Sequence, residues 1–208
     1  MKTLQGALWI VSAPSGGGKT SLVRELVRRM DDIVVSISHT TRARRPGEVD
    51  GVDYFFVDES TFMQQVDHGD FVEYASVFNH FYGTSHSQIS AHLAGGMDVV
   101  LDIDWQGAGQ IKSLFPHANS IFILPPGLDV LQQRLLGRKQ DDARTIIHRM
   151  QRARDELSHF AEFDYLMVND LFERAADDLI AIVRADRLRQ ARHAIKEQKL
   201  LSFLLSKQ

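Results

Sequence analysis

Residues 13–20 read Ala13-Pro14-Ser15-Gly16-Gly17-Gly18-Lys19-Thr20 and nearly match the pattern G-x-x-x-x-G-K-[ST], with alanine in the first glycine position. A short apolar segment, residues 7–12, precedes this stretch, and an amphipathic helical pattern begins at Lys19. Three consecutive glycines allow several backbone N–H groups to point at one phosphate cluster, at the positive end of the following helix. A simple strand-to-helix turn explains one or two glycines, but not three followed by Lys-Thr. The sequence therefore predicts a nucleotide phosphate loop in which Lys19 contacts the outer phosphates and Thr20 offers its hydroxyl to Mg²⁺.

Strand-like and helix-like patterns alternate along the chain, which predicts an α/β fold. The predicted strands cover residues 7–12, 33–38, 54–57, 71–78, 97–103, 120–124 and 165–168. The predicted helices cover residues 19–30, 60–69, 85–94 and 128–157, followed by one long helix from Leu171. Residues 39–51 contain Pro46, Gly47 and Gly51 and are predicted as a loop. We expect a parallel-sheet core that is interrupted near residues 39–85 and 128–155.

Composition excludes several classes of protein. The 208 residues contain 24 Lys+Arg and 27 Asp+Glu, a net charge of −3, with 44% hydrophobic residues and no cysteine. The charge argues against a general nucleic-acid binder, and the lack of cysteine excludes a disulfide scaffold and a cysteine-ligated zinc site. Because no apolar run approaches the length of a membrane span, we expect a cytoplasmic protein with no membrane partner.

Two segments are basic although the whole chain is not. Residues 39–47 contain Arg42, Arg44 and Arg45 and no acid, and residues 134–154 contain seven basic residues against two acids. A basic segment is often only a solvated surface. The guanidinium group, however, binds phosphate through two parallel hydrogen bonds, and the hydroxyl of Tyr54 could donate to the same phosphate.

Glu73 lies in the middle of a strand-like segment in which Phe71, Glu73, Ala75 and Val77 are predicted to share one side. A carboxylate on a strand can accept two hydrogen bonds, from N1–H and from the 2-amino group of guanine. Adenine has neither donor, so such a site would reject it by leaving a buried carboxylate unpaired. The pattern therefore indicates a guanine site.

Two carboxylates follow another apolar strand. Asp102 and Asp104 alternate with Ile103 and therefore leave the strand on the same side, as expected near Mg²⁺. Acids at the exposed end of a strand are common, but the phosphate loop favours the metal interpretation. We predict that Asp102 either acts on Mg²⁺ through water or orders the loop.

The chain resembles the bacterial guanylate kinases, which are nucleoside monophosphate kinases. The resemblance rests on residues 12–21, 38–42, 45–48, 53–56, 81–85, 101–107, 121–126 and 168–170. It implies a P-loop parallel-sheet core with helices on both faces, formed by residues 1–38, 86–126 and 156–208. It also implies a small mixed β/α subdomain that binds GMP, residues 39–85, and a helical lid, residues 127–155. The implied reaction is Mg²⁺-dependent transfer of the γ-phosphoryl group of ATP to GMP or dGMP.

The resemblance also implies a role for individual residues. The ATP site would comprise Ala13, Pro14, Ser15, Gly16, Gly17, Gly18, Lys19, Thr20, Ser21, Arg134 and Asn169. The GMP site would comprise Ser38, Arg42, Arg45, Tyr54, Glu73, Tyr82, Thr84 and Asp104. The catalytic residues would be Lys19, Arg42, Arg138 and Arg149, and Mg²⁺ would be held by Thr20 and, through water, by Asp102.

Two other functions stay open at this stage. A P-loop kinase of a phosphorylated sugar would not need Glu73, and a non-catalytic guanylate-kinase-like interaction module typically lacks a complete phosphate loop, whereas Gly18-Lys19-Thr20 is intact here. The last turns of the C-terminal helix, with Leu200, Leu201, Leu204 and Leu205, carry more apolar surface than the core requires. They are a candidate contact between copies of the chain in a homo-oligomer.

Overall fold

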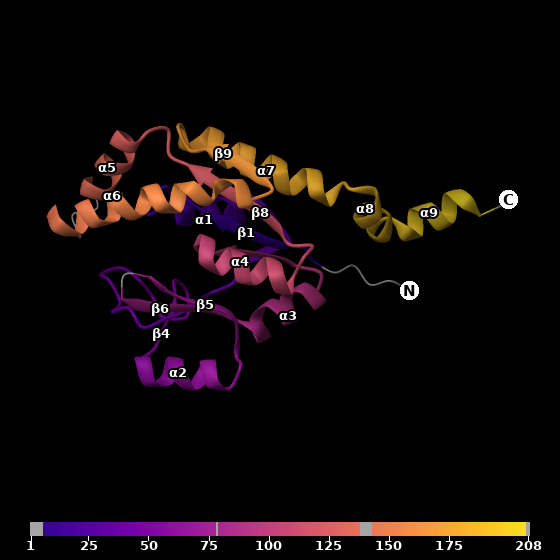
Figure 1. Ribbon diagram of the computed structural model, residues 1–208. Coiled ribbons are helices and arrows are strands. Elements are labelled where there is room, and N and C mark those ends of the chain that lie inside the picture. Colours follow the sequence, from indigo (N-terminus) through magenta and orange to yellow (C-terminus); the bar gives the residue numbers. More distant parts are fainter. Residues whose placement is uncertain (1–5, 78, 138–142, 207–208) are drawn as a thin grey trace.

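Five parallel strands form the central sheet of the computed structural model, which describes residues 6–77, 79–137 and 143–206 (Figure 1). Their order in the sheet is β2 (Ile33–Val35), β7 (Asp98–Asp102), β1 (Leu8–Ser12), β8 (Asn119–Leu124) and β9 (Tyr165–Val168). Strand β1 is central, and Ile10 lies opposite Leu101 on one side and Ser120 on the other. Because the strands are parallel, their carboxyl ends meet at one edge. That edge carries both the phosphate loop and Asp102.

Helices cover both faces of this sheet. α1 (Lys19–Arg29) and α7 (Phe172–Arg187) pack against Trp9 and Val11 on one face. α3 (His86–Ala94) and α4 (Trp105–Leu114) pack against Leu8 and Ile10 on the other. This division follows from β1 itself, since successive residues of a strand point to opposite faces. The predicted α/β core with helices on both faces is confirmed.

A second, mixed sheet lies beside the core and is built by the chain between β2 and α3 (Figure 1). Its order is β4 (Phe55–Phe56), β3 (His39–Thr40), β6 (His80–Ser85) and β5 (Phe71–Val77). β3 runs parallel to β4 and antiparallel to β6, and β6 runs antiparallel to β5. α2 (Glu59–Asp67) covers one side, where the buried Phe62 packs against Phe71 and Phe81. The side-chain amide of Gln110 in α4 bonds both backbone groups of Tyr74, at 3.2 and 2.9 Å, and so ties this sheet to the core.

The strands β3 and β6 and the helix α4 occur where the sequence pattern predicts no such element. The two strands depend on each other, since His39 pairs with Gly83 and Thr40 pairs with Tyr82. α4 contains two glycines, which obscure its helical period. Its start is fixed by Asp104, whose carboxylate accepts a hydrogen bond from the N–H of Gly107 at 2.9 Å.

A β-bulge in β5 changes the predicted alternation. Phe71 pairs with Ser85, whereas Glu73 pairs with the adjacent Thr84. As a result, Phe71 packs on Phe62 of α2, with ring centroids 4.7 Å apart, while Glu73 lines a cavity beside residues 13–21. The prediction that Phe71 shares the side of Glu73 is therefore wrong.

The predicted long C-terminal helix is three helices, α7, α8 (Gln190–Lys196) and α9 (Gln198–Leu205), and the last two extend away from the core (Figure 1). Arg187 before the break and Arg192 after it both bind the fully buried carboxylate of Asp98, the first at 2.9 Å. On one continuous helix two residues five positions apart point in directions about 140° apart. The turn at Leu188 lets both arginines reach the same acid.

The helical pattern over residues 128–157 corresponds to α5 (Leu128–Gly137) and α6 (Ala143–Ser158), and a short 3₁₀ helix, η1 (His159–Glu162), follows α6. Within the described ranges, no helix combines the length and the apolar character needed to cross a membrane.

Candidate active site

The phosphate loop joins β1 to α1 at the carboxyl edge of the sheet. Gly16 and Gly18 have φ angles of +89° and +93°, a region that favours glycine. A Cβ on Gly18 would collide with the side-chain amide of Asn169. That amide, which is buried, donates to the carbonyl of Gly17 at 2.9 Å, and Arg134 donates to the carbonyl of Asn169 at 2.9 Å. Residues 134 and 169 therefore support the loop from behind.

Lys19 reaches from the loop to the end of β7. Its Nζ lies 2.8 Å from Oδ1 of Asp102 and donates to the carbonyl of Ile103, also at 2.8 Å. The side chains of Lys19 and Asp102 are only 19% and 16% exposed, so solvent screens this ion pair less than a surface pair. Thr20, in the first turn of α1, adds an exposed hydroxyl. Carboxylate and hydroxyl oxygens are the donors that Mg²⁺ prefers.

One cavity of about 220 Å³ adjoins both the phosphate loop and the second sheet. Its lining from the loop is residues 13–21, and its lining from the second-sheet side is Ser38, Arg45, Tyr54, Glu73, Ala75, Val77 and Tyr82. Asp102, Ile103 and Asp104 after β7, with Arg149 and Glu156 of α6, complete it. The phosphate loop and a buried carboxylate thus face one cavity that is partly open to solvent.

Glu73 is the buried acid of this cavity, with 4% of its surface exposed. It accepts a hydrogen bond from the hydroxyl of Thr84, and Gly107 of α4 makes room for it, since a Cβ there would lie 2.6 Å from Oε2. Burial raises the pKa of Glu73 to about 7 and Asp104 acts in the same direction, against the opposing effects of Thr84 and Lys19. The carboxyl group therefore changes charge near neutral pH.

Two tyrosines and two arginines lie on the second-sheet side. Tyr54 and Tyr82 meet edge to face with ring centroids 5.9 Å apart, and both line the cavity together with Arg45. The guanidinium of Arg42 lies 5.4 Å from the centre of the Tyr54 ring and binds both carboxylate oxygens of Glu48, at 2.7 and 3.0 Å. Burial raises the pKa of Tyr54 well above its usual range, so its hydroxyl remains a donor at any physiological pH.

The structure thus places most of the predicted site residues on the cavity. Four lie elsewhere: Arg42 stands beside Tyr54, Thr84 behind Glu73, and Arg134 and Asn169 behind the loop. Arg138 lies outside the described residues.

Gly107 and Glu156 were not among the predicted site residues, although Gly107 lies within segment 101–107 of the resemblance. Gly107 shapes the space around Glu73, and Glu156 lines the cavity. Glu156 follows Arg149 by seven positions and so shares its face of the predicted helix, but this spacing alone does not mark it as a site residue.

The fold and the cavity define a P-loop nucleotide-binding protein. The guanylate kinase family model matches residues 5–186. The guanylate kinase of Legionella pneumophila (strain Lens) is 59% identical over 203 residues, which are 98% of this chain and 97% of the relative. The guanylate kinase of Pseudomonas fluorescens (strain Pf0-1) is 55% identical over 200 residues, 96% of this chain and 97% of the relative. The crystal structure of guanylate kinase from Anaplasma phagocytophilum aligns with a TM-score of 0.77 at 32% identity, covering 95% of this chain and 97% of that one. The chain belongs to the guanylate kinase family.

Proposed function

We propose that this protein transfers the γ-phosphoryl group of ATP to GMP, producing ADP and GDP. The observation that carries this proposal is one cavity bounded by the phosphate loop with Lys19 and by the buried carboxyl group of Glu73. Relatives named guanylate kinase, at 59% and 55% identity over nearly the whole chain, support it.

In this proposal residues 39–85 form the GMP-binding subdomain. Ionised Glu73 accepts hydrogen bonds from N1–H and the 2-amino group of guanine, and Ser38, Thr84 and Asp104 complete the base side. Arg42, Arg45, Tyr54 and Tyr82 hold the phosphate of GMP, since guanidinium groups and a protonated tyrosine hydroxyl all donate to phosphate oxygens. These interactions do not involve the ribose 2′-hydroxyl, so we include dGMP as a substrate.

The phosphates of ATP would lie on residues 13–21, with Arg134 and Asn169 toward the adenine. The oxygen donors of Thr20 and Asp102 fit Mg²⁺, and we assign Thr20 as a direct ligand and Asp102 as a ligand through water. When bound there, Mg²⁺ would neutralise charge on the phosphates. Chelation with EDTA is therefore expected to abolish turnover.

The chemistry requires positioning and positive charge rather than a general base. The phosphoryl group passes in line to an oxygen of the GMP phosphate, which is already ionised near neutral pH, and negative charge spreads over the transferring group. Lys19, Arg42, Arg138 and Arg149 would neutralise this charge, and Arg149, only 9% exposed, lines the cavity. Residues 127–155 would act as a lid that excludes water and limits ATP hydrolysis.

The two alternative functions, a sugar-phosphate kinase and a non-catalytic interaction module, explain fewer features of the site. A kinase of a phosphorylated sugar gives no role to Glu73, which is buried and hydrogen-bonded to Thr84. A non-catalytic interaction module gives no role to an intact loop with Lys19 in contact with Asp102.

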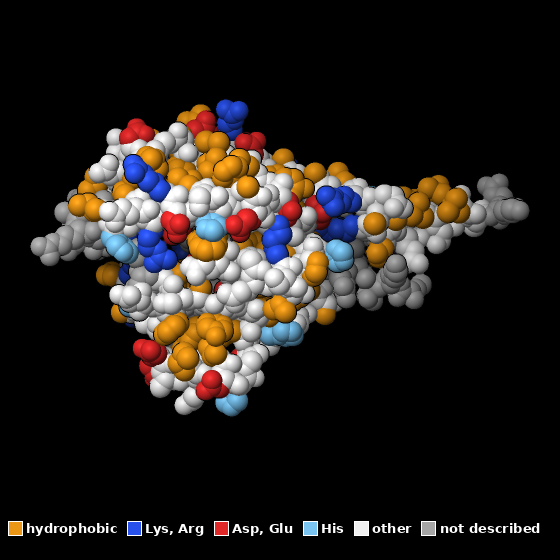
Figure 2. Space-filling view, viewed as in Figure 1, with side chains coloured by type: hydrophobic (Ala, Val, Ile, Leu, Met, Phe, Trp, Pro, Cys, Tyr) orange, Lys and Arg blue, Asp and Glu red, His pale blue; other side chains and the backbone are white. Residues whose placement is uncertain are grey.

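We also propose that α9 contacts a second copy of the chain. Its side chains Leu200, Leu201, Phe203, Leu204 and Leu205 are exposed, and Figure 2 shows hydrophobic side chains gathered on this extension. Light scattering on the intact chain, compared with a Phe203→Glu variant, tests this contact. We further propose that the protein acts in the cytoplasm.

Product analysis tests the proposed reaction. The enzyme, incubated with Mg²⁺, ATP and GMP, should form ADP and GDP in equal amounts. ADP without GDP would indicate hydrolysis, and no product at all would favour the interaction module.

A further inference from the structure

Helix α6 reaches the phosphate loop through one buried carboxylate. Glu156 is 7% exposed, and its Oε2 accepts a hydrogen bond from the backbone N–H of Ser15 at 2.8 Å, across 141 positions of sequence. Burial raises the pKa of Glu156, whereas the Ser15 N–H and the charges of Arg152 and Lys19 act the opposite way. The Glu156 carboxylate therefore contacts the backbone of the phosphate loop directly.

Glu156 shares one face of α6 with Arg149. The two residues are two helical turns apart, about 10.5 Å along the axis, and Ala153 between them is fully buried. Arg149 and Glu156 both line the cavity. Because residues at this spacing form one stripe on a helix, a hydrogen bond at Glu156 restrains the rotation and the axial position of the face that carries Arg149.

A second contact holds the same end of α6. The ring of His159, directly after the helix, stacks on Trp105 with centroids 3.5 Å apart and planes 8° apart. Trp105 is the first residue of α4, a helix of the core. The carboxyl end of α6 is thus attached to the core at two points, the phosphate loop and the start of α4.

We propose that Glu156 is a positioning residue for phosphoryl transfer. Its hydrogen bond with the Ser15 N–H fixes the register of α6 on the phosphate loop and thereby delivers Arg149 to the transferring phosphoryl group. This inference rests on the proposed function, because the role of Arg149 is part of it. Glu156 acts through Arg149 and through the loop backbone, not by contact with substrate.

Kinetics give the first test. Glu156→Ala should lower kcat by about 10²-fold, the effect of misplacing a reacting contact by about 1 Å, while KM for GMP changes less than about twofold. Glu156→Gln keeps an oxygen that can accept the Ser15 N–H and should restore most of kcat. Asp178→Ala, at an exposed acid of α7 and outside the proposed lid, is the control and should leave kcat unchanged.

A double variant separates positioning from a general structural effect. If Glu156 acts through Arg149, then Glu156→Ala should cost little further activity in an Arg149→Ala background. An equal 10²-fold loss in both backgrounds would overturn the proposal, and so would an unchanged kcat in the single variant.

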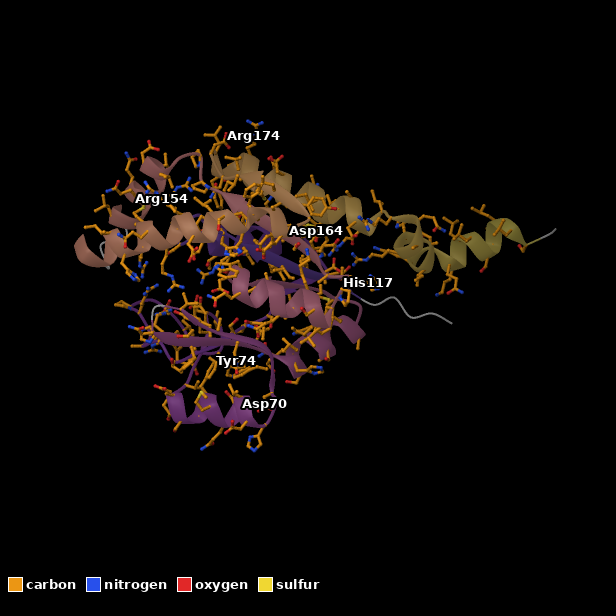
Figure 3. The ribbon with its side chains drawn as sticks, in the orientation of Figure 1. Asp70, Tyr74, His117, Arg154, Asp164 and Arg174 are labelled. Atoms are coloured by element: carbon orange, nitrogen blue, oxygen red, sulfur yellow. The ribbon has the colours of Figure 1, made fainter. Side chains whose placement is uncertain are left out.

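A distance measurement makes the test independent of activity. The chain has no cysteine, so nitroxide labels can be attached at Arg154→Cys on α6 and Arg174→Cys on α7, both exposed (Figure 3). Electron spin resonance should give one narrow distance distribution for the parent and for Glu156→Gln, and a broad or shifted one for Glu156→Ala. If Glu156→Ala does not fold, Glu156→Asp, one methylene too short to reach Ser15, should broaden the distribution while keeping the parent's circular dichroism.

The outcomes are distinguishable. An unchanged distribution in Glu156→Ala or Glu156→Asp overturns the inference even if the enzyme phosphorylates GMP. A broadened distribution in a protein that phosphorylates no nucleotide supports the contact with the loop and contradicts the proposed function instead.

Discussion

The Nζ atom of Lys19 lies 2.8 Å from Oδ1 of Asp102, and this contact joins the phosphate loop to the end of the neighbouring strand β7. β1 and β7 are adjacent and parallel, so the residues that follow them meet at one edge of the sheet. The strand order therefore brings together the cation that we assign to the phosphates and the carboxylate that we assign to Mg²⁺, although 83 positions separate them in sequence.

Removing this cation should stop the reaction without unfolding the protein. Lys19→Ala is expected to lower kcat by on the order of 10²–10³-fold, because the partly buried positive charge that we assign to the transferring phosphoryl group is lost. A coupled assay of ADP release measures the loss, and circular dichroism checks the fold. An unchanged kcat would show that Lys19 is not a catalytic residue.

The two glycines of α4 provide a matched pair of substitutions. Gly107→Ala would place a Cβ 2.6 Å from Oε2 of Glu73 and should raise KM for GMP by about tenfold while leaving KM for ATP unchanged. Gly109 has nothing within 4 Å of its added Cβ, so Gly109→Ala should leave both constants unchanged and stabilise the helix by about 0.5–1 kcal/mol. Equal effects of the two variants on GMP would contradict the role given to Gly107.

The raised pKa of Glu73 predicts a pH-dependent stability. Its pKa is about 7 in the folded protein against an ordinary value of 4.5, so between these pH values the folded state holds a proton that the unfolded chain has lost. The contribution of this group to the free energy of unfolding therefore falls as pH rises from 4.5 to 7. A Glu73→Gln variant has no carboxyl group to ionise at this position, so its free energy of unfolding should not show this decrease.

Urea unfolding without nucleotide, from pH 5 to 8, measures this effect. The gain in stability of Glu73→Gln over the parent should grow with pH and level off above pH 7, at on the order of 3 kcal/mol. A difference that stays constant across this range would show that Glu73 ionises at its ordinary pKa.

Tyr54→Phe removes a single hydroxyl from the phosphate side of the proposed GMP site. Because a hydrogen bond to a charged group contributes about 1.5–3 kcal/mol, KM for GMP should rise by roughly 10–100-fold while KM for ATP is retained. The edge-to-face contact with Tyr82 does not need the hydroxyl, so the melting temperature should change little. A rise in the KM for ATP alone would show that Tyr54 contacts ATP and not GMP.

Sequence patterns predicted the parts of the molecule that local chemistry determines. The phosphate loop is specified by its own glycines and by the strand and helix around it, and the apolar strands of the core are continuous runs. β6 was not predicted because its residues become a strand only through pairing with β3 and β5. The bulge in β5 was also missed, since the same residues alternate regularly in the sequence.

The candidate active site was likewise predicted only in part. Glu73 stands out in the sequence as an acid within an apolar strand, whereas its surroundings depend on Thr84 and Gly107 from two other elements. Glu156 was missed because its partner is a backbone N–H far away in the sequence, and no side-chain motif records such a contact.

Acceptor specificity is the decisive test of whether this protein phosphorylates GMP. ADP release, measured with ATP and Mg²⁺ over GMP, dGMP, AMP, UMP and ribose 5-phosphate, should occur with GMP and dGMP alone, and Glu73→Gln should lower kcat/KM for GMP by about 10²-fold while ATP still binds. Turnover of AMP or ribose 5-phosphate equal to that of GMP, or a Glu73→Gln variant that still uses GMP at the parent rate, would contradict the account.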